Sequence, residues 1–317
     1  MPTIFSTLKP ASNRHIATIQ RNALVSWTLL NPRPEIIIFG NEEGSEEICR
    51  ELGLTQVVDV ERNEFGTPLV KDIFGQAQHL AKNDILCYVN ADIILTSSFN
   101  SALLHIQEWK RGFLVVGRRW DADIRECLNF AEPGWEADLK RLVGQMNILR
   151  EPCWIDYFIF KKGIYDTMPA FALGRSAWDN WLVWNALKRG ASVIDGTEAI
   201  FAVHQRHNYS HIKFMDNKRL QSPEILRNLE YMEDWSKCCT IDNSQYVLTD
   251  SGIRKRIRWR YLSAYGRLRF WELVHWARMV SHGLCHSEDK AEDAKARGCI
   301  HSNESSKEVE KSTGRIL

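Results

Sequence analysis

The chain has 317 residues, 44% of them hydrophobic and 26% charged, which is ordinary for a globular protein and enough for one large domain with an appendage. The formal net charge of +1 gives no overall attraction to nucleic acid, which we exclude as a partner. No stretch reaches the roughly 20 apolar residues of a membrane-spanning helix, and the N-terminus lacks the pattern of a signal peptide. With eight scattered cysteines, these features favour a cytoplasmic protein whose cysteines are reduced.

Apolar runs alternate with helical spacing over the first 120 residues. We expect strands at 3–8, 35–39, 56–60, 84–89 and 113–117, and helices at 13–30, 46–52, 69–82 and 100–109. The run Ile36-Ile37-Ile38 is typical of a strand buried on both faces of a parallel sheet. The alternation predicts an α/β fold, with a mostly parallel central sheet and helices on both faces. Ligands of such sheets bind at the carboxyl ends of the strands.

The later part of the chain is less regular. We expect a helical insertion at about 121–150, strands at 154–160, 191–195 and 199–203, a helix at 176–189, and further helices at 223–235 and 251–281. From residue 286 Ser, Glu, Lys and Asp dominate, which indicates disorder. The predicted organisation is a domain at 1–215, a C-terminal helical region at 216–285 and a tail at 286–317.

A polar turn, Asn90-Ala91-Asp92, follows directly on an apolar strand. A carboxylate there faces the ligand crevice, where a divalent cation with oxygen ligands bridges the two phosphates of a nucleotide-sugar. Such a cation stabilises the charge that builds on the departing diphosphate. In the alternative interpretation, Asp92 only caps the segment that follows the strand.

Three histidines, His204, His207 and His211, lie close together in the sequence. The intervening segment Asn208-Tyr209-Ser210 disfavours a helix, so we expect a loop. One imidazole, from His204 or His207, then completes the cation site of Asp92. Alternatively, the histidines are hydrogen-bonded residues of a polar loop.

Two further carboxylates are candidates for catalysis. Asp179 follows Ser176 with the spacing of a capping box, which is its structural explanation. As a functional residue, Asp179 is a general base that removes the proton from an acceptor hydroxyl. Trp178 and Trp181 beside it suit either a sugar ring or the protein core. Asp156 is a lone carboxylate in an apolar strand, so it either meets a basic neighbour or faces the site.

Lys9, Arg118 and Arg119 are cations at expected strand ends, where they suit diphosphate oxygens. The sequence has neither the G-x-G-x-x-G nor the G-x-x-x-x-G-K-[ST] pattern. Their absence weakens the case for a dinucleotide dehydrogenase or a nucleotide-hydrolysing motor.

Residues 3–211 resemble the nucleotide-diphospho-sugar transferase superfamily, the GT-A glycosyltransferase fold, and within it a subgroup of bacterial and plant glycosyltransferase-like proteins. The resemblance lies in an ordered set of motifs: Ser6-Thr7-x-Lys9-Pro10, Phe39-Gly40-Asn41-Glu42-Glu43, Asn90-Ala91-Asp92, Trp178-Asp179-Asn180-Trp181 and the histidine segment 204–211. It implies transfer of a hexosyl or related group from a nucleotide-diphosphate donor to a glycan or other hydroxyl acceptor, assisted by Mn²⁺ or Mg²⁺.

The resemblance also implies roles by position. The donor-binding residues are then Thr7, Lys9, Gly40, Asn41, Glu42, Asn90 and Arg118. Asp92 with a histidine of the 204–211 loop, His204 or His207, holds the metal, and Asp179 is the acceptor base. Asp156 is a further candidate for catalysis because of its place in the strand, not because of the resemblance. Asn90 departs from the family's Asp-x-Asp motif. Because an amide oxygen ligates a cation without adding charge, lower metal affinity is expected.

Two other functions stay open. A sugar nucleotidyltransferase usually shows a glycine-rich loop after the first strand, where this chain has Thr7-Leu8-Lys9-Pro10. A non-catalytic nucleotide- or glycan-binding protein of the same fold is the other, and Asn90 favours it.

The expected helix at 251–281 is basic and amphipathic. Apolar residues recur at three- and four-residue spacing, with arginines between them: Ile253, Ile257, Tyr261, Leu268 and Trp271 against Arg254, Arg256, Arg258, Arg260, Arg267 and Arg269. Residues 253–281 then bind either an anionic membrane surface, as a peripheral protein does, or the catalytic domain, with the basic face in solvent.

Overall fold

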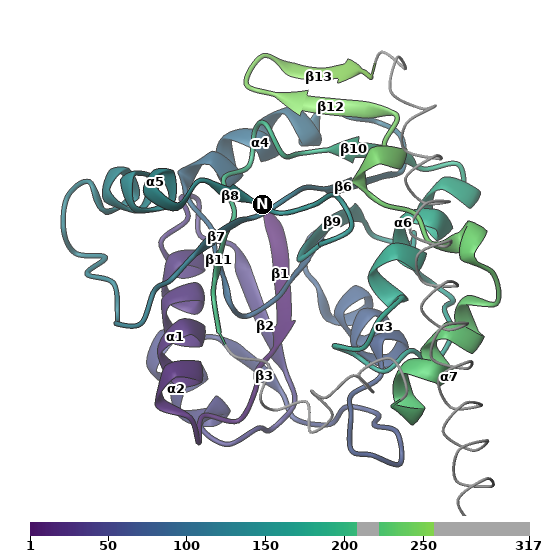
Figure 1. The fold of residues 1–317 in the computed structure, drawn as a ribbon, viewed down its shortest axis with the longest axis horizontal. Helices are drawn as coiled ribbons and strands as arrows, with labels where there is room; N and C mark the ends of the chain where they lie inside the picture. Colours follow the sequence, from purple (N-terminus) through teal and green to yellow (C-terminus); the bar gives the residue numbers. More distant parts are fainter. Residues whose placement is uncertain (208–221, 257–317) are drawn as a thin grey trace, which may run out of the picture. The chain divides into compact units, whose positions relative to one another are not determined.

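A nine-stranded sheet forms the centre of the computed structural model, which describes residues 1–207 and 222–256 (Figure 1). Its strands are β1 (Pro2–Thr7), β2 (Glu35–Phe39), β3 (Thr55–Val57), β4 (Ile85–Val89), β6 (Phe113–Val116), β9 (Tyr157–Lys161), β10 (Ser192–Asp195), β12 (Tyr246–Thr249) and β13 (Gly252–Lys255). Their order is β13-β12-β10-β6-β9-β4-β1-β2-β3. Neighbours are parallel, except that β9 runs antiparallel to β4 and β6, and β13 antiparallel to β12. The expected mostly parallel sheet is confirmed.

Helices cover both faces of this sheet (Figure 1). One layer holds α1 (Arg14–Thr28), α2 (Ser45–Leu52) and α4 (Ser97–Gln107), and the other holds α3 (Val70–Leu80), α6 (Trp178–Lys188) and α7 (Pro223–Met232). In strand β4, alternate side chains pack against the helices on opposite faces of the sheet. Leu86 and Tyr88 pack in the layer of α3 and α6, while Cys87 and Val89 pack in that of α1 and α4. Burial on both faces explains why the strands read as continuous apolar runs.

A second, four-stranded sheet stands beside the first. It has the order β5-β11-β7-β8, from β5 (Ile93–Ile94), β11 (Val203–Gln205), β7 (Trp120–Ala122) and β8 (Ile148–Leu149). Helix α5 (Trp135–Met146) packs Leu139 and Val143 against it. The helical insertion expected at 121–150 therefore contains one helix, but strands lie at both of its ends. The alternation of Trp120, Ala122 and Ile124 is the strand signal in that segment.

The chain from residue 246 differs from the expected basic helix. Gly252–Lys255 forms β13, which pairs with β12 across a tight turn. The segment forms a β-hairpin rather than a helix because β12 pairs with β10 and so extends the central sheet. The sheet thus continues past the expected boundary at residue 215, and residues 1–257 form one compact unit. The rest of the expected basic helix and the tail lie outside the described residues.

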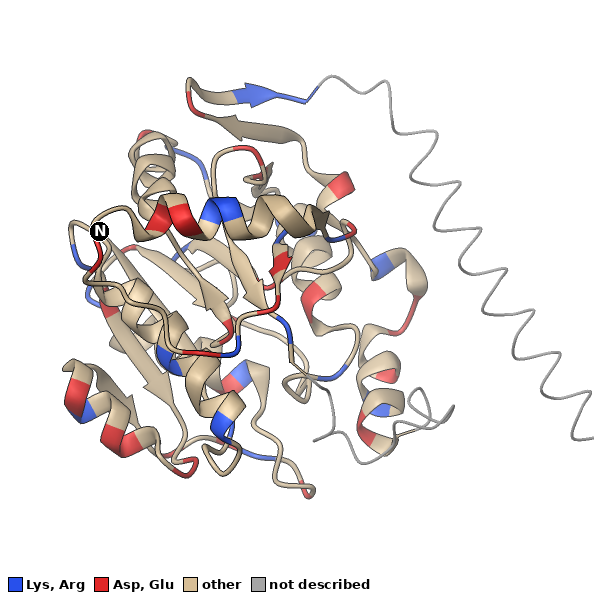
Figure 2. Cartoon of the chain, turned by 60° about the vertical axis from the view of Figure 1, so that its left-hand side comes forward, with Lys and Arg blue, Asp and Glu red and all other residues tan. Residues whose placement is uncertain are grey.

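Charged side chains lie mainly on helices, loops and β13, and the inner strands carry few of them (Figure 2). Asp121 on β7 and Asp195 on β10 are exceptions, at 0% and 9% exposure, and Asp156, at 5%, directly precedes β9. In the described ranges, Cys49, Cys87, Cys127, Cys153 and Cys239 are free cysteines. None of the helices in these ranges is long and apolar enough to span a membrane.

Candidate functional site

A cavity of about 480 Å³ opens at the carboxyl ends of β1 and β4. Because β9 runs antiparallel, with Tyr157 opposite Val89, the residues that precede β9 lie at the same edge. The turn after β4, the start of α6 and the end of β11 meet there. The residues lining the cavity include Thr7, Lys9, Glu42, Asn90, Asp92, Arg119, Trp154, Asp156, Asp179, His204 and His207.

Three potential metal ligands converge on one side of this cavity. Ligand atoms of Asp92, His204 and His207 all lie within 4.8 Å of one another. Nε2 of His207 is 3.0 Å from Asp92 Oδ2, and Nε2 of His204 is 3.9 Å from the same oxygen. The third histidine of the segment, His211, lies outside the described residues.

Asp92 carries an unsatisfied oxygen in this cluster. Its Oδ1 is buried and has no hydrogen-bond partner in the part of the chain that the structure describes. A buried carboxylate oxygen without a donor is costly, and a bound cation would offset that cost. Burial opposes ionisation of Asp92, but His204, His207 and Lys9 together hold its pKa below the ordinary range.

Asp121 orients His204. Its Oδ1 is 3.2 Å from His204 Nδ1, so the imidazole turns Nε2 toward Asp92. Arg150 donates to Oδ2 of Asp121 at 2.7 Å, and Arg119 Nε lies 3.4 Å from Oδ1. Despite burial, the hydrogen bonds from His204 and Arg150 keep the pKa of Asp121 below its usual range. A carboxylate behind a histidine is the usual second layer of a metal site.

Sequence reasoning missed Asp121 because it fell in the expected helical insertion.

Lys9 brings a positive charge to the cluster. Its Nζ lies 3.3 Å from His207 Nε2 and 3.8 Å from Asp92 Oδ2. Gln20 holds the backbone of Lys9 at both ends: its Oε1 accepts from the N–H at 2.5 Å, and its Nε2 donates to the carbonyl at 3.0 Å. The Lys9 ammonium is thereby held at the cavity wall, where it could contact diphosphate oxygens.

Asp179 lies in the first turn of α6 and faces the cavity. Burial raises the pKa of Asp179 to about 7, and nearby Asp156 adds to the shift. The expected capping box with Ser176 is wrong: no side chain caps α6, and Asp179 accepts from the N–H of Asn180. The preceding Ala177 has a φ of 89°, a strained value for a residue with a Cβ and one typical of functional sites.

Asp156 does not face the cavity as a free carboxylate. Its Oδ1 accepts from Asn90 Nδ2 at 2.7 Å, and its Oδ2 accepts from Arg119. Asp156 therefore meets a basic neighbour and also lines the cavity. Arg119, rather than Arg118, is the arginine that reaches the cavity. Arg118 donates to the carbonyls of Leu149 and Arg150 and so holds β8 in place.

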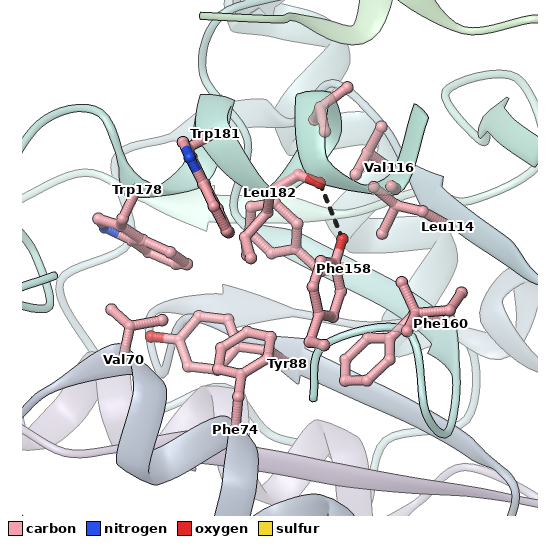
Figure 3. Close-up of a cluster of buried hydrophobic side chains, with 14 of the residues drawn as sticks. Val70, Phe74, Tyr88, Leu114, Val116, Phe158, Phe160, Trp178, Trp181 and Leu182 are labelled. Carbon is pink, nitrogen blue, oxygen red and sulfur yellow. Dashed lines mark hydrogen bonds between the residues drawn. The ribbon is translucent and has the colours of Figure 1, made fainter. Parts of the chain in front are cut away.

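The tryptophans beside Asp179 belong mainly to the core. Trp178 and Trp181 are each 5% exposed, and Figure 3 shows them among the aromatic side chains between the sheet and α6. Trp178 packs 5.5 Å from the rings of Tyr88 and Phe158, measured between centroids. Trp178 also lines the cavity, but the more exposed tryptophan there is Trp154, at 38%, which sequence reasoning did not single out.

The turn after β2 contributes only in part. Glu42 lines the cavity and pairs with Arg62 at 2.6 Å. Gly40 and Asn41 are not among the described residues that line it. Gly40 has a φ of 99°, in the left-handed region that favours glycine, so its conformation explains its presence.

Comparisons with known proteins give remote likenesses only. No protein-family model matches the sequence, and no curated protein matches it. The chain is similar to a solved structure of glucosyl-3-phosphoglycerate synthase from Mycobacterium tuberculosis in complex with Mn²⁺, uridine diphosphate and phosphoglyceric acid. The TM-score is 0.44 and the identity 14%, over 75% of this chain and 78% of that one.

A mannosyltransferase from Pyrobaculum calidifontis, solved with GDP-Man and Mn²⁺, is also similar. Its TM-score is 0.44 and its identity 12%, over 73% of this chain and 64% of that one. Similarity at this level leaves the function to be argued from the geometry of the cavity.

Proposed function

We propose that this chain is a GT-A-type glycosyltransferase, which moves a sugar from a nucleotide-diphosphate donor to a hydroxyl acceptor. One observation carries the proposal: Asp92, His204 and His207 meet in the same cavity as Asp179, whose pKa is raised to about 7. Transfer from a nucleotide-sugar needs positive charge at the diphosphate and a base at the acceptor. The cavity offers both kinds of group side by side.

Asp92, His204 and His207 would hold a divalent cation, and the unsatisfied Oδ1 of Asp92 fits that role. When bound, such a cation stabilises the negative charge on the departing diphosphate. Two imidazole ligands disfavour Mg²⁺, which prefers oxygen ligands, relative to transition metals. Asp121 behind His204 keeps the ligating nitrogen available.

The protein's own groups would divide the remaining work. Lys9 binds diphosphate oxygens, and Thr7 and Glu42 line the donor side of the cavity. Asp179 accepts the proton of the acceptor hydroxyl, whose oxygen bonds to the anomeric carbon as the bond from that carbon to the diphosphate breaks. Direct displacement of this kind inverts the configuration at the anomeric carbon. A base with a pKa of about 7 is well matched to that proton transfer.

Trp154 supports a sugar acceptor. Its exposed indole lines the cavity, and the guanidinium carbons of Arg119 and Arg150 lie 5.3 and 5.6 Å from the ring centroid. Both arginines contact the buried Asp121, so the indole rests on fixed groups. An exposed, rigid aromatic face packs well against the apolar C–H face of a pyranose ring.

The direct test is calorimetric titration of UDP and GDP with and without Mn²⁺, followed by a panel of nucleotide-sugars assayed for metal-dependent hydrolysis. We expect tight nucleotide binding only with the metal, and slow hydrolysis of at least one donor. Asp92→Ala should abolish both while the protein stays folded. Asp138→Ala, which removes an exposed carboxylate on α5, is the matched control. Absence of metal-dependent binding and turnover in the wild type would reject the transferase assignment.

One observation favours a second candidate, a non-catalytic nucleotide-binding protein. The Lys9 ammonium already lies at the cluster, 3.8 Å from Asp92 Oδ2, and can itself serve as the cation for a diphosphate. This candidate predicts nucleotide binding that EDTA leaves intact and that Lys9→Met abolishes. The same titrations therefore separate the two functions.

A further inference from the structure

Asn90 and Asp156 contact each other through both backbone and side chain. The Asn90 N–H donates to the Asp156 carbonyl at 2.9 Å, and Asn90 Nδ2 donates to Asp156 Oδ1 at 2.7 Å. The other end of the amide is also used, because Asn90 Oδ1 accepts from the Tyr88 hydroxyl at 3.1 Å. The amide is held in one orientation, with its donor side against a carboxylate.

An aspartate at position 90 would not fit this arrangement. A carboxylate has no N–H to donate, so the 2.7 Å contact would set two negatively charged oxygens against each other. Asp156 is 5% exposed, and water therefore screens little of the repulsion. The asparagine in the turn is thus the partner that the carboxylate at position 156 requires.

The position of that carboxylate also matters for the rest of the site. Asp156 pairs with Arg119, Arg119 contacts Asp121, and Asp121 holds His204. The carboxylate of Asp156 is thus the first of a series of charged contacts that ends at His204. Asn90 is not itself charged, and its side chain joins this series through its hydrogen bonds to Tyr88 and Asp156.

We propose that Asn90 and Asp156 are a coupled pair, in which Asn90 is the positioning residue that keeps the carboxylate of Asp156 against Arg119. Asn90→Asp therefore damages the protein, and Asp156→Asn repairs the damage. The role of the pair in donor turnover rests on the proposed function, whereas the coupling itself does not.

The test compares four full-length proteins: the wild type, Asn90→Asp, Asp156→Asn and the double variant. Thermal unfolding is measured in EDTA. We expect Asn90→Asp to lower Tm by about 5 °C or more, because a buried hydrogen bond becomes a repulsion. The double variant should recover at least half of that loss. Full recovery is not expected, since Arg119 then faces an amide oxygen.

Turnover of a donor that the wild type hydrolyses is the second readout. We expect Asn90→Asp to lower kcat/KM at least about tenfold, and the double variant to regain much of it. A residue that affected only stability would leave kcat/KM of the folded fraction unchanged.

Asn129→Asp is the matched control. Asn129 Nδ2 donates to Glu132 Oε2 at 3.2 Å, which is the same chemistry on an exposed loop. Its Tm should change by less than about 1 °C, because water screens the new pair.

Two results would overturn the coupling: an Asn90→Asp variant as stable and active as the wild type, or a double variant no better than Asn90→Asp. If Asn90→Asp fails to fold, a folded double variant supports the pair, and an unfolded one refutes it. A wild type that hydrolyses no donor would defeat the proposed function, while the comparison of Tm values would still decide the pair.

Discussion

As the proposed base, Asp179 would combine a catalytic advantage with a cost in stability. Its folded-state pKa of about 7 lies above the ordinary value of 3.8, so burial disfavours the charged form. For a group with a raised pKa, the contribution to stability is fully present below the unfolded value and is lost as pH rises through the folded value. The carboxylate needed as a base above pH 7 is therefore the form that destabilises the fold.

We predict that Asp179→Asn lowers kcat for sugar transfer about 10²- to 10⁴-fold and raises Tm. The gain in Tm should grow as pH rises from 4 to 8, because only the wild type then carries the buried charge. In the wild type, kcat should rise with pH and level off above about 7. Thermal unfolding and initial rates over this range test both statements. A variant whose Tm follows that of the wild type at every pH would show that Asp179 is not buried in charged form.

Asp121 contacts His204, one of the proposed metal ligands, so its replacement should change the metal affinity. We predict that Asp121→Asn weakens Mn²⁺ binding about 10- to 100-fold, measured by electron paramagnetic resonance or calorimetry. Asp123→Asn, two residues along and paired with Arg125 at the surface, should leave the affinity within about twofold. Equal changes in the two variants would remove the orienting role of Asp121.

At the level of elements, α7 ties together loops that line the cavity. Glu224, in its first turn, is 8% exposed and accepts from Asn63 at 2.8 Å and from Arg175 at 2.8 Å. Asn63 belongs to the loop before α3, and Arg175 to the loop before α6. Burial opposes ionisation of Glu224, but these donors keep its pKa below the ordinary value. The helix thus connects two cavity walls that are more than 100 residues apart in the chain.

We predict that Glu224→Gln costs about 2 kcal/mol, or roughly 4–8 °C in Tm, at pH 7. Because the pKa of Glu224 is lowered, its stabilisation is present above the usual carboxyl range and is lost as pH falls below it. The difference in Tm should therefore shrink in acid. Glu64→Gln removes an exposed pair with Arg227 on the same helix and should have little effect. Equal losses in both variants would contradict a special role for Glu224.

For the whole molecule, the compact unit ends near residue 257, and the basic segment 253–281 lies mostly beyond it. We propose that this segment binds anionic membrane surfaces, where each Lys or Arg contributes about 1 kcal/mol. Flotation with phosphatidylserine-containing vesicles should recover the full chain but not a chain that ends at residue 257, and raised salt should release it. Equal flotation of the two chains, or none by either, would refute the proposal.

The sequence by itself determined the central sheet from β1 to β10, without its edge strands β12 and β13, and the candidates at its carboxyl edge. Apolar runs such as Ile36–Ile38 indicate buried strands whatever the neighbours are, because the signal lies in adjacent residues. The turn 90–92 and the histidine segment from 204 could be found in the same way, since parallel strands bring their carboxyl ends to one edge. The strands β7, β8 and β12 could not, because they are short and owe their conformation to pairing with distant segments.

Only the tertiary structure decided which candidates work together. Asn90 meets Asp156 across 66 residues, and Asp121 meets His204 across 83, so both pairings depend on how the sheets are assembled. Arg118 and Arg119 are equivalent in sequence, yet only one of them reaches the cavity. The physical reason is that successive side chains of an extended chain point in opposite directions. Which direction meets the cavity is set by strand register, a property of the whole fold.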